Sequence, residues 1–166
     1  MAELKDTGNR RDFGTGAVRD MAEGKGRCDL LPLDIVWQLF PEGDDRRDVF
    51  YHLNRYQETK KAKHLRELID KFAETDFGGI SDMLLEVAVH FEDGARKYGD
   101  NNWRNGIPCR CYLDSAIRHY LKYCRGDEDE PHRRAFVWNI LCCLWTQEHY
   151  GYDLEGLKND TIAKEQ

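Results

Sequence analysis

The spacing of apolar residues in the second half of the chain is the feature that most constrains its fold. Between residues 80 and 98 they recur every three or four positions, which places them on one face of a helix: Ile80, Met83, Leu84, Val87, Phe91, Ala95 and Tyr98. Residues 109–124 repeat this spacing. A third segment, 131–149, is apolar nearly all round between Ala135 and Trp145, which is typical of a helix at the centre of a core. No segment alternates convincingly with period two. We therefore predict an all-α protein, a compact helical bundle.

The N-terminal half adds a basic arm and further helices. Residues 1–27 contain five of the 14 glycines together with Arg10, Arg11, Arg19, Lys25 and Arg27. We predict that residues 1–32 form an irregular arm packing on the core, that 33–150 form a single all-α domain, and that 151–166 form a C-terminal tail. Within the domain we expect a short helix over 33–40 and a charged helical stretch over 45–73, interrupted near 57–64.

Composition excludes several classes of protein. The 166 residues include 25 Lys and Arg against 31 Asp and Glu, a formal net charge of −6, with no basic block. This balance makes a nucleic-acid polymer an improbable partner. The longest mostly apolar run is residues 135–145, shorter than the roughly 20 residues that span a membrane. The N-terminus has no apolar stretch of signal-peptide type, so we expect a cytoplasmic protein without a membrane partner. The six cysteines then favour reduced, buried thiols over disulfides.

Two groups of polar residues could bind a metal. Glu86, His90, Asp93 and Lys97 share one stripe of the helix over 80–98. Such a stripe could hold Mg²⁺ or Mn²⁺, or could be a solvated face. Four acidic residues, 127–130, precede the last helix, whose first turn contains His132. They could supply metal ligands or only complement the helix dipole.

Other polar residues are candidates for ligand contacts. On the helix over 109–124, Asp114 and Arg118 are spaced as an ion pair, and His119 lies roughly 140° from Asp114 at about 100° per residue. Asn139 sits within the apolar helix, and its amide needs partners in the core or on a ligand. In the loop 97–106, Trp103 could stack on a base and Arg104 could meet a phosphate, or both could belong to a helix connection.

Several blocks of the sequence resemble a phage and prophage family named for a dATP/dGTP diphosphohydrolase N-terminal domain. The blocks are Gly16-Ala17-Val18-Arg19-Asp20, residues 24–32, Glu86, and residues 94–106, 114–119, 125–129 and 131–139, the last from Pro131-His132 to Asn139. They cover residues 14–32 and 80–149, so residues 41–78 look like a helical insertion between them. The family is similar to the MazG-type all-α nucleotide pyrophosphatases, which use acidic residues on adjacent helices to bind Mg²⁺. A phage or prophage origin is therefore expected.

The resemblance implies a metal-dependent pyrophosphohydrolase that converts a purine (d)NTP to the (d)NMP and pyrophosphate. Mg²⁺ or Mn²⁺ would be bound by the acidic set Glu86, Asp114, Asp127, Glu128 and Asp129. His119 or His132 would be the general base. The substrate would contact Arg19, Lys25, Arg27, Lys97, Asn102, Trp103, Arg104, Arg118 and Asn139. The resemblance also leaves room for a homo-oligomer.

Two further functions stay open on the sequence. The chain lacks a Glu-Glu-x-x-Glu motif followed by Glu-x-x-Asp, which favours a protein that binds a nucleotide or nucleotide signal without hydrolysing it. Alternatively, the charged helices over 45–73 would form a partner surface, and the polar clusters would be structural. Turnover of a nucleotide would support the pyrophosphohydrolase, and binding without turnover would support the nucleotide-binding protein. A stable oligomer without nucleotide binding would support the partner surface.

Overall fold

The computed structural model describes residues 8–21 and 23–157, and the chain divides into two compact units. One unit is Leu30–Leu85. The other combines the residues up to Asp29 with those from Glu86 onward. The predicted all-α class is confirmed, because helices dominate the described residues and their one sheet has two short strands. Residues 1–7 and 22 of the predicted arm and 158–166 of the predicted tail lie outside the described residues.

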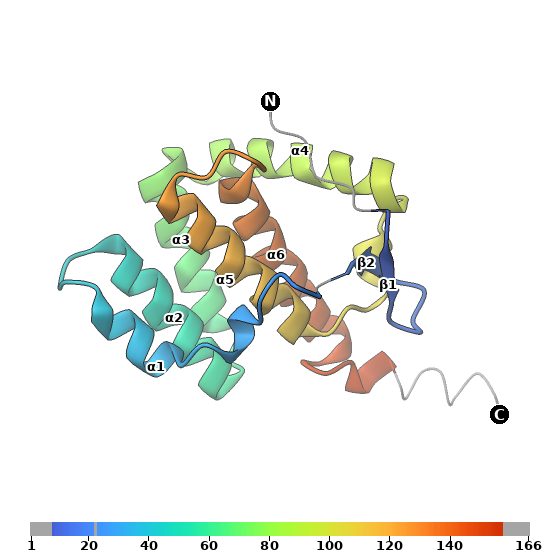
Figure 1. Ribbon diagram of the computed structural model, residues 1–166, viewed down its shortest axis with the longest axis horizontal. Helices are drawn as coiled ribbons and strands as arrows, with labels where there is room; N and C mark the ends of the chain where they lie inside the picture. The colour runs from blue at the N-terminus through green and yellow to red at the C-terminus, as the bar shows by residue number, and fades with distance from the viewer. Residues whose placement is uncertain (1–7, 22, 158–166) are drawn as a thin grey trace. The chain divides into compact units, whose positions relative to one another are not determined.

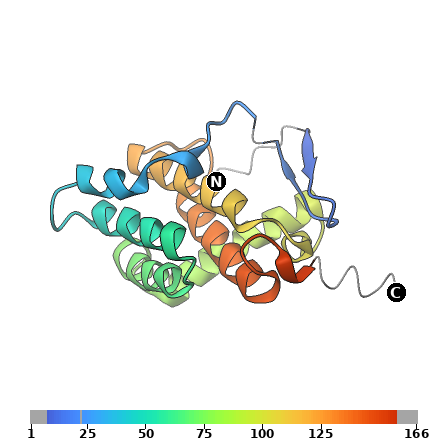
Figure 2. The same ribbon diagram turned by 90° about the horizontal axis from the view of Figure 1, so that it is seen from below.

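The unit Leu30–Leu85 is built around a helical hairpin (Figure 1). Helix α1 (Leu33–Val36) and the short 3-10 helix η2 (Trp37–Leu39) precede α2 (Asp45–Thr59) and α3 (Lys63–Phe77). Asp44 caps the start of α2, because its side chain accepts a hydrogen bond from the backbone N–H of Arg46 at 2.9 Å. Lys60 caps its end, in the left-handed conformation with φ 55°. This break confirms the interruption expected near 57–64. Helices α2 and α3 pack side by side (Figure 2).

The second unit contains the C-terminal part of α4 (Ile80–Tyr98), the 3-10 helix η3 (Asn102–Asn105), α5 (Cys109–Arg125) and α6 (His132–Tyr150). The bounds of α4, α5 and α6 fall within one residue of the predicted ranges 80–98, 109–124 and 131–149. Helices α5 and α6 pack against each other. Most of their buried side chains are apolar or aromatic, among them Tyr112, Ala116, Ile117, Phe136 and Ile140. No helix in the described part of the chain is long and apolar enough to cross a membrane.

The arm contains a small hairpin where an irregular segment was expected. Strand β1 (Arg10–Asp12) pairs antiparallel with β2 (Val18–Asp20), with Arg11 opposite Arg19. Gly14 and Gly16 in the connection have φ of 70° and 87°, which glycine adopts without steric cost. Strands of three residues are too short to show a period-two pattern, so the sequence does not predict them. A turn of 3-10 helix, η1 (Cys28–Leu30), follows.

Candidate functional site

A pocket of about 460 Å³ lies within the unit that combines the arm with the residues from Glu86 onward. Its wall comes from the hairpin and the arm residues after it, α4, residues 99–103, α5, the acidic turn 127–130 and α6. Segments that are distant in the sequence therefore meet here. Its volume falls in the range of about 300–1,000 Å³ that is usual for small-molecule sites.

The hairpin lies beside the end of α4 (Figure 1), and Asp20 joins the two. Its Oδ2 accepts a hydrogen bond from Lys97 Nζ at 2.7 Å. Its Oδ1 accepts from the Tyr98 hydroxyl at 2.9 Å and from Arg10 Nη1 at 3.1 Å. Burial, together with the hydrogen bond to Asp20, raises the pKa of Tyr98, so its hydroxyl stays a donor. Lys97 lines the pocket, as its predicted role requires, and it also neutralises Asp20.

Two asparagine side chains in the pocket wall bind the strand β2. Asn102 Oδ1 accepts from the N–H of Val18 and its Nδ2 donates to the carbonyl of Val18, both at 2.9 Å. Asn139 is 2% exposed; its Oδ1 accepts from Arg19 Nη2 at 2.7 Å and its Nδ2 donates to the carbonyl of Ala135 at 2.8 Å. The predicted need of the Asn139 amide for partners is therefore met within the chain, and Arg19 is fixed in the wall.

Asp114 and Arg118 anchor the arm where it passes α5. Arg118 donates to the carbonyls of Lys25 at 3.1 Å and Gly26 at 2.9 Å, and it pairs with Asp114. Asp114 is buried, and its Oδ1 accepts from the N–H of Cys28 at 2.7 Å. Both oxygens of this predicted metal ligand thus have partners in the protein, while its side chain lines the pocket.

His119, His132 and Asp129 form a chain of hydrogen bonds that ends in the pocket wall. His132 is 2% exposed, and its Nε2 lies 2.7 Å from Asp129 Oδ1. The Nδ1 atoms of His132 and His119 are 2.9 Å apart. His119 and Asp129 line the pocket, whereas His132 lies between them and does not. Sequence analysis predicted both histidines as site residues, and the structure brings them together.

The chemistry of this chain follows from its hydrogen-bond partners. A carboxylate can only accept, so His132 donates from Nε2 and, when neutral, accepts at Nδ1. His119 must then donate from Nδ1, which leaves a lone pair on its Nε2. Burial, reinforced by the neighbouring His132, holds the pKa of His119 well below its ordinary value, so its ring is neutral near pH 7. This tautomer is assigned from the network. A neutral imidazole of this kind can accept a proton.

Two buried polar atoms in the pocket wall have no hydrogen-bond partner among the described residues. They are Nδ1 of His90 and Nε1 of Trp138, whose rings lie 5.4 Å apart, centre to centre. Burial, with smaller effects from Arg134 and Arg19, lowers the pKa of His90 to about 3. A buried polar atom without a partner costs about 1–3 kcal/mol.

The pocket is cationic although the chain has a net charge of −6. Eight basic and five acidic side chains line it. Arg27 forms a bidentate pair with Asp29, with distances of 2.7 and 2.6 Å. The side chains of Lys25 and Arg110 are exposed and have no hydrogen-bond or ion-pair partner in the described parts of the chain. These two cations are the ones most available to an anion.

The remaining predicted residues are placed as follows. Trp103 lines the pocket and packs edge-on against Trp145, with ring centres 5.1 Å apart. Arg104 lies over the Trp103 ring at 4.8 Å, outside the pocket wall. Three of the predicted metal ligands are also outside it: Glu86, Asp127 and Glu128. Glu86 pairs with Arg133, and Asp127 pairs with Arg125. Asp127, Asp129 and His132 bring one ligand atom each within 4.8 Å of the others.

The sequence analysis gave no ligand role to several residues of the pocket, chiefly Asp20, Arg110 and Trp138. Asp20 carried the only signal, because it lies in a block that resembles the family. Arg110 follows the first residue of α5, and it reads as a surface cation until the arm is placed beside it.

The fold and the pocket define an all-α protein with a cationic, histidine-containing cavity of small-molecule size. The chain belongs to the family described as "dATP/dGTP diphosphohydrolase, N-terminal", whose profile matches residues 53–154. The matched region includes α3, α5 and α6, and residues 53–78 of the expected insertion, but not the arm. Neither the curated proteins nor the solved structures contain a significant match.

Proposed function

We propose that the pocket binds a purine deoxynucleoside triphosphate and hydrolyses it to the monophosphate and pyrophosphate, with His119 as general base. The observation that carries the proposal is the hydrogen-bonded chain from Asp129 through His132 to His119, which ends in a cationic pocket. The family name supplies the substrate class and the type of reaction.

In this reaction water attacks the α-phosphorus, and the bond from that phosphorus to the oxygen bridging to the β-phosphate breaks. His119 Nε2 takes the proton of the attacking water. The imidazolium that forms donates through Nδ1 to His132, which donates in turn to Asp129, so the carboxylate stabilises the new charge. Pyrophosphate leaves with the electron pair of the broken bond.

The free cations of the pocket suit the triphosphate. Lys25 and Arg110 are exposed and without partners in the described residues, so they can bind phosphate oxygens without breaking an existing pair. Arg19 is fixed by Asn139 and adds its charge to the wall. The unsatisfied atoms of His90 and Trp138 lie in the same wall and would bind the base or the sugar.

The residues at the pocket rim fit a hard divalent cation such as Mg²⁺ or Mn²⁺. Asp129 and Glu130 both line the pocket, and carboxylate oxygens are the ligands these ions prefer. Together with phosphate oxygens they would hold the ion, with Asp127 nearby. Asp129 also accepts from His132 and pairs with Lys122 at 3.3 Å, so the ion would take the place of Lys122 beside it. When bound, the ion would neutralise phosphate charge and polarise the bond that breaks. Glu86, which pairs with Arg133 outside the pocket, fits this role less well.

The test is to incubate the protein with each dNTP and NTP in Mg²⁺, in Mn²⁺ and in EDTA, separating the products by phosphate number. We expect monophosphate and pyrophosphate from a purine nucleotide. His119→Asn keeps a donor near the position of Nδ1 but removes the base. It should lower kcat about 10²- to 10⁴-fold with little change in nucleotide binding. His149→Asn, at an exposed histidine outside the pocket, is the control. Equal turnover by His119→Asn and His149→Asn would refute the assignment.

A second candidate is nucleotide binding without hydrolysis. It is favoured by Asp114 and Glu86, two predicted metal ligands whose carboxylates already pair with Arg118 and Arg133. Binding that raises the melting temperature, with no product in either metal, would select it.

A further inference from the structure

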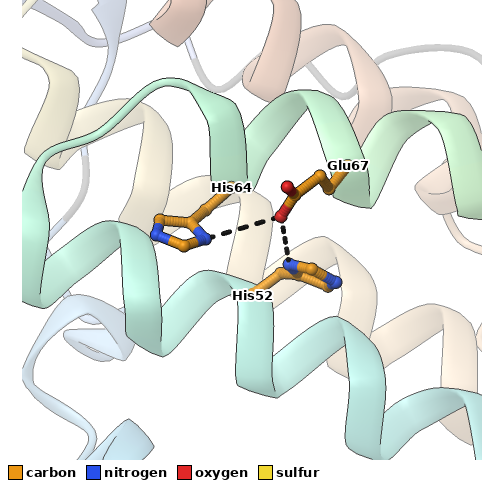
Figure 3. A group of neighbouring side chains, drawn as sticks. All are labelled: His52, His64 and Glu67. Atoms are coloured by element: carbon orange, nitrogen blue, oxygen red, sulfur yellow. Dashed lines mark ion pairs between the residues drawn. The ribbon is translucent and has the colours of Figure 1, made fainter.

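A second group of metal-binding side chains lies in the other unit, on the hairpin of α2 and α3. His52 projects from α2, and His64 and Glu67 project from the first turns of α3 (Figure 3). Glu67 Oε2 lies 3.5 Å from His52 Nδ1 and 3.6 Å from His64 Nδ1. The three residues offer ligand atoms that all lie within 4.8 Å of one another. Nothing in the proposed hydrolysis uses them.

The two histidine nitrogens that face Glu67 lack hydrogen bonds. Nδ1 of His52 and Nδ1 of His64 are buried, and neither has a hydrogen-bond partner among the described residues. His64 is 7% exposed, so water does not readily replace the missing partner. Burial lowers the pKa of both histidines, so both rings are neutral near pH 7. Neutral imidazole is the form that binds metals, and the Nδ1 atoms of both rings face Glu67 Oε2 (Figure 3).

Glu67 lies from each histidine nitrogen at close to the distance that a shared metal ion requires. Zn²⁺ binds histidine nitrogen at about 2.0–2.1 Å and carboxylate oxygen at about 2.0–2.2 Å, usually in a tetrahedron, which sets neighbouring ligand atoms roughly 3.3–3.5 Å apart. The distance of 3.5 Å from Glu67 to His52 already meets this, and the distance of 3.6 Å from Glu67 to His64 exceeds it only slightly, while all three ligand atoms lie within 4.8 Å of one another. Small rotations of the exposed Glu67 side chain, 53% exposed, could shorten the longer distance.

We propose that His52, His64 and Glu67 form a binding site for a divalent transition metal of the Zn²⁺ type. Two imidazoles and one carboxylate suit Zn²⁺, whereas Mg²⁺ and Ca²⁺ prefer oxygen ligands throughout. The exposure of Glu67 leaves a fourth position for water. The three-residue turn 60–62 joins α2 to α3. The ion would add a second link between the two helices, from His52 on α2 to His64 and Glu67 on α3. It would therefore stabilise the hairpin, because it binds only when both helices are in place.

The experiment uses the full chain, freed of metal by a chelator and titrated with Zn²⁺. Histidine-selective ¹H–¹⁵N NMR reports each ring nitrogen, with signals assigned from His52→Gln and His64→Gln. We expect the Nδ1 signals of His52 and His64 to shift with one equivalent, and the melting temperature to rise. Mg²⁺ should move neither signal. This readout separates the site from His119 and His132, which could also bind Zn²⁺.

Glu67→Gln and Glu74→Gln form a matched pair on α3. Each removes one negative charge from an exposed glutamate, and Glu74 lies outside the cluster. Glu67→Gln should weaken Zn²⁺ binding by about 10- to 100-fold or more, because losing even a residue that only supports a metal ligand usually costs that much. Glu74→Gln should bind Zn²⁺ as the natural protein does. The proposal is overturned if the two variants bind Zn²⁺ equally, or if Zn²⁺ shifts only the signals of His119 and His132. The two proposals are independent: this site can bind Zn²⁺ in a protein that hydrolyses no nucleotide, and the pocket can hydrolyse a nucleotide if this site binds no metal.

Discussion

Replacing His90 with glutamine should make the protein markedly less sensitive to acid. His90 is 5% exposed in the pocket wall, and burial lowers its pKa to about 3 from its ordinary value of 6.5. In the unfolded chain the ring takes up a proton near pH 6.5, whereas in the folded chain it resists protonation until about pH 3. The unfolded state therefore binds more protons across this window. Stability is full above pH 6.5 and falls as the pH drops toward 3.

The size of the effect follows from the pKa shift. Each pH unit within the window costs about 1.4 kcal/mol, so His90 alone should remove about 2 kcal/mol of the free energy of unfolding between pH 6.5 and 5. Glutamine keeps a polar group of similar length and does not titrate. His90→Gln should therefore lose about 2 kcal/mol less than the natural protein over this interval, whatever its stability at pH 7.

Urea unfolding followed by circular dichroism at pH 7 and pH 5 measures this double difference. Other buried histidines titrate in both proteins and cancel in the comparison. His149→Gln, at an exposed position, controls for the loss of a histidine as such and should follow the natural protein. If His90→Gln and the natural protein lose the same free energy, the burial of a neutral His90 is not what makes the fold sensitive to acid.

Two further predictions concern the backbone. Lys60→Gly should raise the free energy of unfolding by roughly 0.5–1 kcal/mol, because Lys60 caps the end of α2 with φ 55°, where a side chain is strained. A urea titration measures this, and an unchanged or lower urea midpoint would contradict it. Asn102→Ala removes two hydrogen bonds to Val18, each worth about 1 kcal/mol. Amide exchange in the hairpin should become faster while that in α6 stays the same, and equal exchange rates at Val18 in the two proteins would count against the anchoring role.

The helices were predictable from the sequence because their signals are local. Each run of apolar residues at helical spacing stops just before a glycine, Gly99 or Gly126. The structure ends α4 at Tyr98 and α5 at Arg125, as these glycines predict. The buried amide of Asn139 was also recognised as a group that needs partners. Its partner, Arg19, lies in a distant part of the chain, so no local pattern could identify it.

The candidate site was less predictable because it depends on how segments meet. His119 and His132 lie on different helices, and only the course of the turn between α5 and α6 brings their rings together. The same holds for His52 and His64, whose approach depends on the left-handed Lys60 that ends α2. Spacing rules describe residues on one helix and are silent about pairs across two.

The pocket is assembled from two stretches of chain, the arm and the residues from Glu86 onward, with the whole Leu30–Leu85 unit inserted between them. For a flexible connection, the entropy lost in bringing such stretches together grows only with the logarithm of its length. Doubling that length would raise the closure free energy by only about 0.6 kcal/mol. Residues added to a flexible connection of the intervening unit should therefore cost the pocket little, provided that the anchors at Asp20 and Asp114 are kept.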